Sequence, residues 1–131
     1  KLAIVGLGGS YSDYIAARIR SEHFDEVWGI NCVGGIIHVD KTIMMDPVSR
    51  FLDSDDAGSQ TGIARKFLEK NTKPILTCEM DDRVEHLEPY PLEAVIKELN
   101  ICYFNNTVPY AIAYAIYYGA KELCLYGLDY T

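Results

Sequence analysis

The sequence lacks a long apolar run, an export leader and an excess of basic residues. No apolar stretch approaches the roughly 18 to 20 residues that a membrane-spanning helix needs, and no charged-then-apolar leader is present. We therefore expect a soluble, cytoplasmic protein without a membrane span. The net charge of −7 opposes the counterion release on which nucleic-acid binding depends, so we do not expect a DNA or RNA polymer as partner.

Metal-site and disulfide spacings are absent as well. The chain has 4 cysteines and 3 histidines, but it has no CxxC pair, and no histidine is spaced with a second ligand as a zinc site requires. Three of the cysteines lie inside apolar runs. We expect reduced, buried thiols and no metal bound through histidine or cysteine. The cysteines are Cys32, Cys78, Cys102 and Cys124.

Two phosphate-binding motifs are missing from the glycine-rich stretch GLGGS at residues 6–10. The dinucleotide motif GxGxxG fails because Tyr11 replaces its third glycine, and because Asn31 rather than an acid follows the second apolar run. The P-loop fails because GLGGS is not followed by the GK[ST] ending. A nicotinamide dinucleotide is therefore disfavoured.

The composition that remains is that of a globular domain. Hydrophobic residues make up 49% and charged residues 24% of 131 residues, enough for one domain with a single core over residues 1–131. The start without methionine and the end just past an apolar run are consistent with a chain trimmed at either end, including truncation at the C-terminus.

Strand and helix patterns alternate along the chain. Short apolar, β-branched runs predict strands at 1–5, 26–31, 36–45, 74–79, 101–104 and 122–130. Helices are predicted at 12–20, 63–70, 91–100 and 109–118, with Ser12 or Asp13 as the first cap and Gly119 ending the last helix. Pro89 and Pro91 predict a loop. This alternation predicts an α/β fold with a mostly parallel sheet and helices on both faces.

The glycine-rich stretch has two interpretations. Ligands of such sheets bind beyond the carboxyl ends of the strands, where Gly6, Gly8, Gly9 and Ser10 follow the first strand. Glycines there permit positive φ and close approach of a phosphate, and the next helix adds a positive N-terminus. The alternative is a tight turn that holds no ligand.

Polar residues follow the other strands. Asn31, Asp46 and Asp129 stand where a ligand at the same edge would reach them, and Asn106 and Thr107 precede the last helix. Each of these residues also suits a cap or a turn. The tyrosines of the last helix predict packing, with nucleobase stacking as the alternative.

These motifs, in order, resemble a known family. KLAIVGLGGS, EVWGIN, a strand ending in MMDP, and NNTVPYAIAYAIYYGAKELCLYGLDYT look like the Rossmann-like proteins that include bacterial lipooligosaccharide sialyltransferases and archaeal hydroxymethylpterin pyrophosphokinase-like (DUF115-type) proteins. The resemblance implies a three-layer Rossmann-like fold. It also implies that a nucleotide, such as the CMP part of a sugar donor, lies against residues 8–10 and Asn31.

The sequence departs from the family pattern at two places. One is the first turn, and the other lies before the long helix, where Thr107-Val108 replaces a Ser-Gly pair. The histidine that serves the sialyltransferases as general base would lie beyond Thr131. Asp46 and Asp129 are then the catalytic candidates, or they contact the sugar or Mg²⁺. Mg²⁺ accompanying the nucleotide is the one cofactor that these residues suggest, and the sequence does not identify any other.

Three functions follow from these residues. The first is a nucleotide-binding or nucleotide-sugar-binding domain of transferase type, transferring a glycosyl or pyrophosphoryl group. The second is a noncatalytic module that sequesters a nucleotide in the same cleft. The third is an interaction protein that retains only the fold. An exposed edge strand or the tyrosine-rich helix offers a surface for a homo-oligomer.

Overall fold

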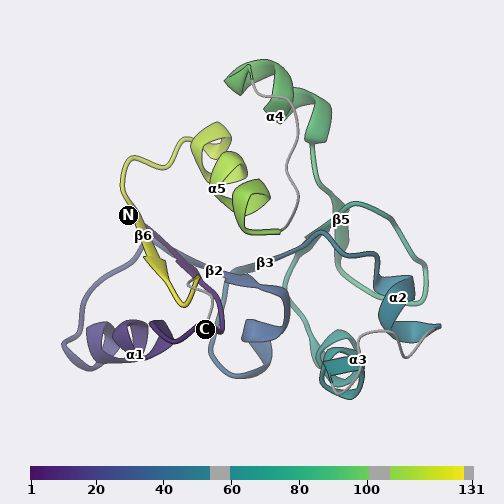
Figure 1. The fold of residues 1–131 in the computed structure, drawn as a ribbon, viewed down its shortest axis with the longest axis horizontal. Coiled ribbons are helices and arrows are strands. Elements are labelled where there is room, and N and C mark those ends of the chain that lie inside the picture. Colours follow the sequence, from purple (N-terminus) through teal and green to yellow (C-terminus); the bar gives the residue numbers. More distant parts are fainter. Residues whose placement is uncertain (54–59, 101–106, 129–131) are drawn as a thin grey trace.

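The described part of the chain folds into a parallel sheet with helices on both faces (Figure 1). A computed structural model describes residues 1–53, 60–100 and 107–128. In these residues six strands run in the order β5-β4-β3-β2-β1-β6, and all five neighbouring pairs are parallel. The fold is a three-layer, Rossmann-like α/β architecture, as the sequence predicts. The strands are β1 (Leu2–Val5), β2 (Glu26–Ile30), β3 (Lys41–Met44), β4 (Ile75–Thr77), β5 (Leu87–Pro89) and β6 (Leu123–Tyr126).

The helices alternate with these strands. They are α1 (Tyr11–Ile19), the 3₁₀ turn η1 (Asn31–Gly35), α2 (Val48–Leu52), α3 (Gln60–Lys70), α4 (Leu92–Leu99) and α5 (Thr107–Tyr118). In Figure 1, α4 and α5 lie above the sheet, and α1, α2 and α3 lie below it. No helix of the described segments is long and apolar enough to cross a membrane.

Strand β1 shows why the sheet is buried on both sides. All four of its residues are buried, as a central strand with helices on each face requires. Leu2 and Ile4 pack in the cluster that contains α5, whereas Ala3 and Val5 pack in the cluster that contains α1. The period of two in side-chain direction therefore divides one apolar run between two cores.

The connection between β2 and β3 differs from the prediction of a strand over 36–45. The strand is only Lys41–Met44, and residues 31–35 form η1. In a parallel sheet the chain must return to the amino edge before the next strand begins, and residues 36–40 make this return. The carboxylate of Asp40 anchors its end by accepting a hydrogen bond from the Val27 N–H at 2.8 Å.

Strand β5 is missing from the sequence prediction, which placed a loop there because of Pro89 and Pro91. The strand lies at an edge of the sheet and pairs with β4 alone. Proline is tolerated on an edge strand because the strand has no second neighbour that would need the missing N–H as a donor. The strand predicted over 101–104 lies outside the described residues.

Two helix predictions need correction and one is confirmed. Helix α1 begins at Tyr11, so neither Ser12 nor Asp13 is its cap. The last helix is apolar on every side, which predicts a fully buried helix, but α5 is not buried along its whole length, because its last three residues, 116–118, are exposed. Gly119 does end α5, with a left-handed φ of 101° and its N–H directed at the Ala115 carbonyl.

The cysteines of the described segments are unpaired thiols, and one of them is not buried as predicted. Cys32 and Cys124 are partly buried, whereas Cys78 is exposed. The Cys78 thiol donates a hydrogen bond to the carbonyl of Met45 at 2.8 Å. Cys102 lies outside the described residues.

Candidate functional site

The strand order reverses at β1, and the predicted site residues lie at the carboxyl ends around this point. Strands β2 to β5 follow on one side of β1, and β6 pairs with its other side. In open parallel sheets the crevice for a ligand forms at such a reversal. Residues 6–10 follow β1, Asn31 follows β2, Asp46 follows β3 soon after its last residue, and Gly127 follows β6. The fold therefore places these positions at one edge of the sheet.

The glycine loop is hydrogen-bonded to the loop after β6. The Gly6 N–H donates to the Tyr126 carbonyl at 2.8 Å, and the Gly8 N–H donates to the Gly127 carbonyl at 2.6 Å. The Gly127 N–H in turn donates to Ser10 Oγ at 2.9 Å. Part of GLGGS thus binds the chain itself, in agreement with a tight turn, and these groups are already engaged before any ligand approaches.

Gly6 is required by close packing rather than by its backbone angle. A Cβ on Gly6 would lie 2.5 Å from the Gly127 carbonyl oxygen, and one on Gly127 would lie 2.1 Å from the Gly6 carbonyl oxygen. In the described segments the glycines with positive φ are Gly119 and Gly127. Gly127, in the opposing loop, is therefore the left-handed glycine of this close pair.

Helix α1 presents its N-terminus to the same loop. Ser10 is the N-cap residue but makes no side-chain capping bond. Its Oγ accepts from Gly127 instead, which explains why the usual capping contact is missing. Asp13, in the first turn of α1, interacts favourably with the positive end of the helix.

Asn31 combines a strained backbone with a buried oxygen. Its φ is 54°, in the left-handed region that asparagine adopts more readily than most residues. Its Oδ1 is buried and has no hydrogen-bond partner. The described residues hold two other such atoms, the hydroxyls of Thr42 and Thr77, and both of these lie within strands. Among the predicted strand-end residues that the structure describes, Asn31 is the one with a buried acceptor that has no partner.

Asp46 and Thr107 are brought together through Met45. The Met45 N–H donates to Thr107 Oγ1 at 3.4 Å, so the start of α5 lies against the end of β3. The half-exposed carboxylate of Asp46 lies 3.4 Å from the guanidinium of Arg50, one turn along the chain. Cys78 also contacts Met45, and sequence reasoning missed it because nothing in the pattern around it indicates a contact between β4 and β3.

Two predicted site residues lie outside the described segments. These are Asn106, directly before α5, and Asp129, shortly after β6. Their assigned roles stay predictions. Gly9 lies in the loop between β1 and α1 with the other residues of GLGGS.

Two tyrosines of α5 pack as the packing interpretation predicts: Tyr110 is buried in the core and Tyr114 packs against it, whereas Tyr117 and Tyr118 are exposed. The Tyr114 ring lies 5.2 Å from Trp28 and 5.7 Å from Tyr90. The Tyr90 hydroxyl donates to the Tyr110 carbonyl at 2.6 Å. Burial raises the pKa of Tyr90 well above its usual value, so its hydroxyl stays protonated and remains a donor.

Comparison with known proteins gives no relative: no family model, curated protein or solved structure matches the chain. The function therefore has to be argued from the site itself.

Proposed function

We propose that this chain is a nucleotide-binding α/β domain of transferase type, with a nucleotide or nucleotide sugar at the carboxyl edge of β1, β2 and β3. In this proposal the phosphates lie against Gly9 and Ser10 at the N-terminus of α1. Asn31 Oδ1 accepts a hydrogen bond from a ribose hydroxyl or an exocyclic amine. Asp46, with Asp129, faces the transferred group or its Mg²⁺.

The buried, unpartnered oxygen of Asn31 carries the proposal. An unsatisfied buried acceptor costs about 1 to 3 kcal/mol, so native proteins rarely keep one without a role. The left-handed φ adds strain of the kind that is concentrated at functional sites. A donor supplied by a ligand would relieve the first cost, and the sugar and base of a nucleotide both offer such donors.

Thermal unfolding with a panel of nucleotides tests the proposal. The panel contains CMP, CTP, ATP, GTP, a CMP-sugar and NAD, each with and without Mg²⁺. A ligand at about one hundred times its dissociation constant stabilises the folded state by about 2.7 kcal/mol, which is several degrees for a domain of this size. We expect a shift with nucleotides of one base and none with NAD. No shift with any of them would favour an interaction protein that retains only the fold. A shift without turnover of the nucleotide would favour a noncatalytic module that sequesters it.

A pair of matched variants assigns the shift to Asn31. Asn31→Gly keeps the left-handed backbone and removes the carboxamide. Asn100→Gly makes the same change at the end of α4, where φ is 52°. Both variants should fold, because glycine adopts this conformation without strain. We expect Asn31→Gly alone to abolish the nucleotide-induced shift, and equal shifts in both variants would contradict the proposal.

A further inference from the structure

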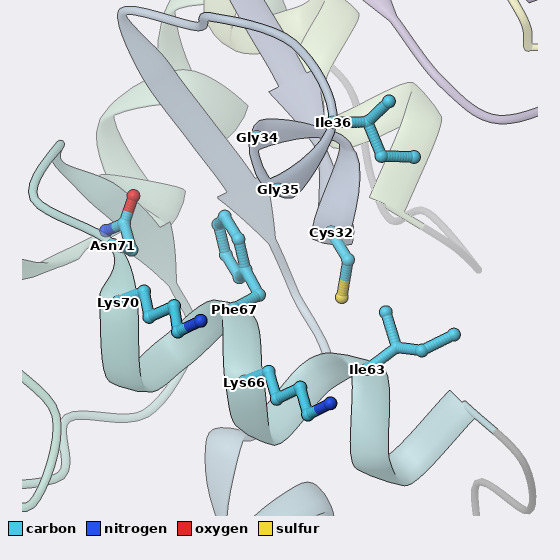
Figure 2. A pocket seen from close by; sticks show the side chains of 9 residues that line it. All are labelled: Cys32, Gly34, Gly35, Ile36, Ile63, Lys66, Phe67, Lys70 and Asn71. Atoms are coloured by element: carbon cyan, nitrogen blue, oxygen red, sulfur yellow. The ribbon is translucent and has the colours of Figure 1, made fainter.

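The structure holds a cleft outside all of the predicted site residues. It lies between η1 and α3, on the face of the sheet that α1 also covers, and has a volume of about 430 Å³ (Figure 2). The connection from β2 to β3 consists of one 3₁₀ turn and a short return, where a longer crossover would carry a full helix. The missing helix leaves α3 with an uncovered side, and this side is one wall of the cleft.

The wall formed by η1 and the start of α3 is apolar. Ile36 is 63% exposed and Ile63 is 61% exposed, unusually open positions for two isoleucines that line one cleft. The ring of Phe67 lies at the base, and a Cβ on Gly34 would lie 2.9 Å from it, so only glycine fits there. Burial raises the pKa of the Cys32 thiol, so this group adds no negative charge near neutral pH.

The α3 side of the cleft also carries two cations. Lys66 and Lys70 are four residues apart, so they lie one turn apart on the same side of α3. Figure 2 shows both ammonium groups directed along the cleft side of the helix. No carboxylate lines the cleft, and no ion pair to either lysine is found in the described segments. In a chain of net charge −7, the cleft is thus a local site of positive charge.

We propose that this cleft binds a small amphipathic anion, a carboxylate or a phosphate monoester carried on an elongated apolar body. The apolar body lies between Ile36 and Ile63 above Phe67, and the anionic head lies between Lys66 and Lys70. The cleft follows α3 from residue 63 to residue 71, about 12 Å at 1.5 Å per residue, which suits an extended ligand rather than a compact ion. The cleft shares no lining residue with the proposed nucleotide site, and its proposal does not depend on that site.

Isothermal titration calorimetry with three probes of one chain length tests the chemistry. The probes are octanoate, octyl phosphate and octylammonium. We expect both anions to bind with one-to-one stoichiometry and octylammonium to bind at least about tenfold more weakly, because two ammonium groups repel it. Binding of either anion supports the proposal, and the ratio of the two affinities identifies the preferred head group. Equal binding of octylammonium, or no binding of either anion, overturns it.

Charge-matched variants locate the site. The double variant Lys66→Glu with Lys70→Glu should weaken anion binding by at least about tenfold. Lys97→Glu with Lys121→Glu changes the net charge equally at exposed positions outside the cleft, and should change the affinity by less than about twofold. An equal loss in both double variants would show that long-range charge alone is measured and would overturn the assignment.

A third variant tests the apolar wall. Ile63→Ser removes an exposed apolar side chain and should not affect folding. We expect this variant to bind octanoate severalfold more weakly than the wild type. The salt dependence of its affinity should stay that of the wild type, because both lysines are retained. Unchanged affinity would contradict the placement of the apolar body, since the isoleucine would then not contact the ligand.

Discussion

At the scale of single residues, Gly6 and Gly127 allow the loop after β1 to pack closely against the loop after β6. Each glycine leaves room for the carbonyl oxygen of the other, and Gly127 also has a left-handed φ of 66°. A strand-to-helix turn predicts glycine at position 6. The sequence alone does not reveal that the contact is with Gly127, because that pairing depends on β6 joining β1 from the far end of the chain.

Gly127→Ala should destabilise the protein by more than about 1 kcal/mol, because alanine is strained at positive φ and its Cβ would overlap the Gly6 carbonyl. Gly62→Ala is the control. No atom lies within 4 Å of a Cβ at this exposed position of α3. It should stabilise by up to about 1 kcal/mol, the helix-propensity difference between the two residues. Urea unfolding measures both, and a neutral Gly127→Ala would refute the close packing of the two loops.

Tyr90 gives a second prediction at this scale. Tyr90→Phe removes the buried hydrogen bond to the Tyr110 carbonyl and should cost about 1 kcal/mol. Tyr117→Phe, at an exposed position of α5, should change the free energy of unfolding by less than about 0.5 kcal/mol. Equal effects in chemical denaturation would mean that the bond linking β5 to α5 contributes nothing.

At the scale of elements, sequence patterns located most strands and helices but not their pairing partners. Apolar runs identified β1 and β2 because both are central and buried on two faces. The pattern failed at residues 36–40, which are apolar enough for a strand but return the chain to the amino edge. It failed at β5 because a rule against proline inside a sheet does not hold at an edge. Both failures have the same cause: the position of a segment in the sheet decides its structure, and this position cannot be inferred from the neighbouring residues alone.

Arg83 links two connecting segments through carboxylates, and this link should be sensitive to acid. Its guanidinium binds Asp53 after α2 with contacts of 2.6 and 2.9 Å, and Asp81 after β4 at 2.7 Å. The hydrogen bonds from Arg83 lower the pKa of both carboxyls, that of Asp81 to about 2. A depressed pKa in the folded state stabilises it above the unfolded pKa, and the contribution is lost as pH falls through the folded value.

Arg83→Met should therefore lower the free energy of unfolding near neutral pH, and the difference from wild type should disappear between about pH 4 and pH 2. Arg18→Met serves as the control, because Arg18 donates to the Glu22 carbonyl rather than to a carboxylate. Its effect should stay constant over the same range. Urea titrations at several pH values give both curves, and a pH-independent effect of Arg83→Met would contradict the linkage.

At the scale of the whole molecule, the sequence predicted which strand ends lie at the same edge of the sheet. It did not predict the hydrogen bonds that the residues at this edge make or lack. The positions of Asn31 and Asp46 after parallel strands were enough to place them at one edge. The hydrogen bond from the Gly127 N–H to Ser10 Oγ joins segments far apart in the sequence, and the burial of the unpartnered Asn31 oxygen depends on tertiary packing. The sequence did not predict the cleft between η1 and α3, because no sequence motif marks a β2–β3 connection that is too short to carry a full helix.

The most direct test of the central claim is an amide NMR titration of nitrogen-15-labelled protein with the nucleotide that gives the largest thermal shift. Binding at the carboxyl edge predicts that the largest chemical-shift changes occur at residues 8–10 and at Asn31. Changes confined to residues 34–36 and 63–71 would place the nucleotide in the η1–α3 cleft. That result, or a spectrum that does not change, would contradict the proposed nucleotide site.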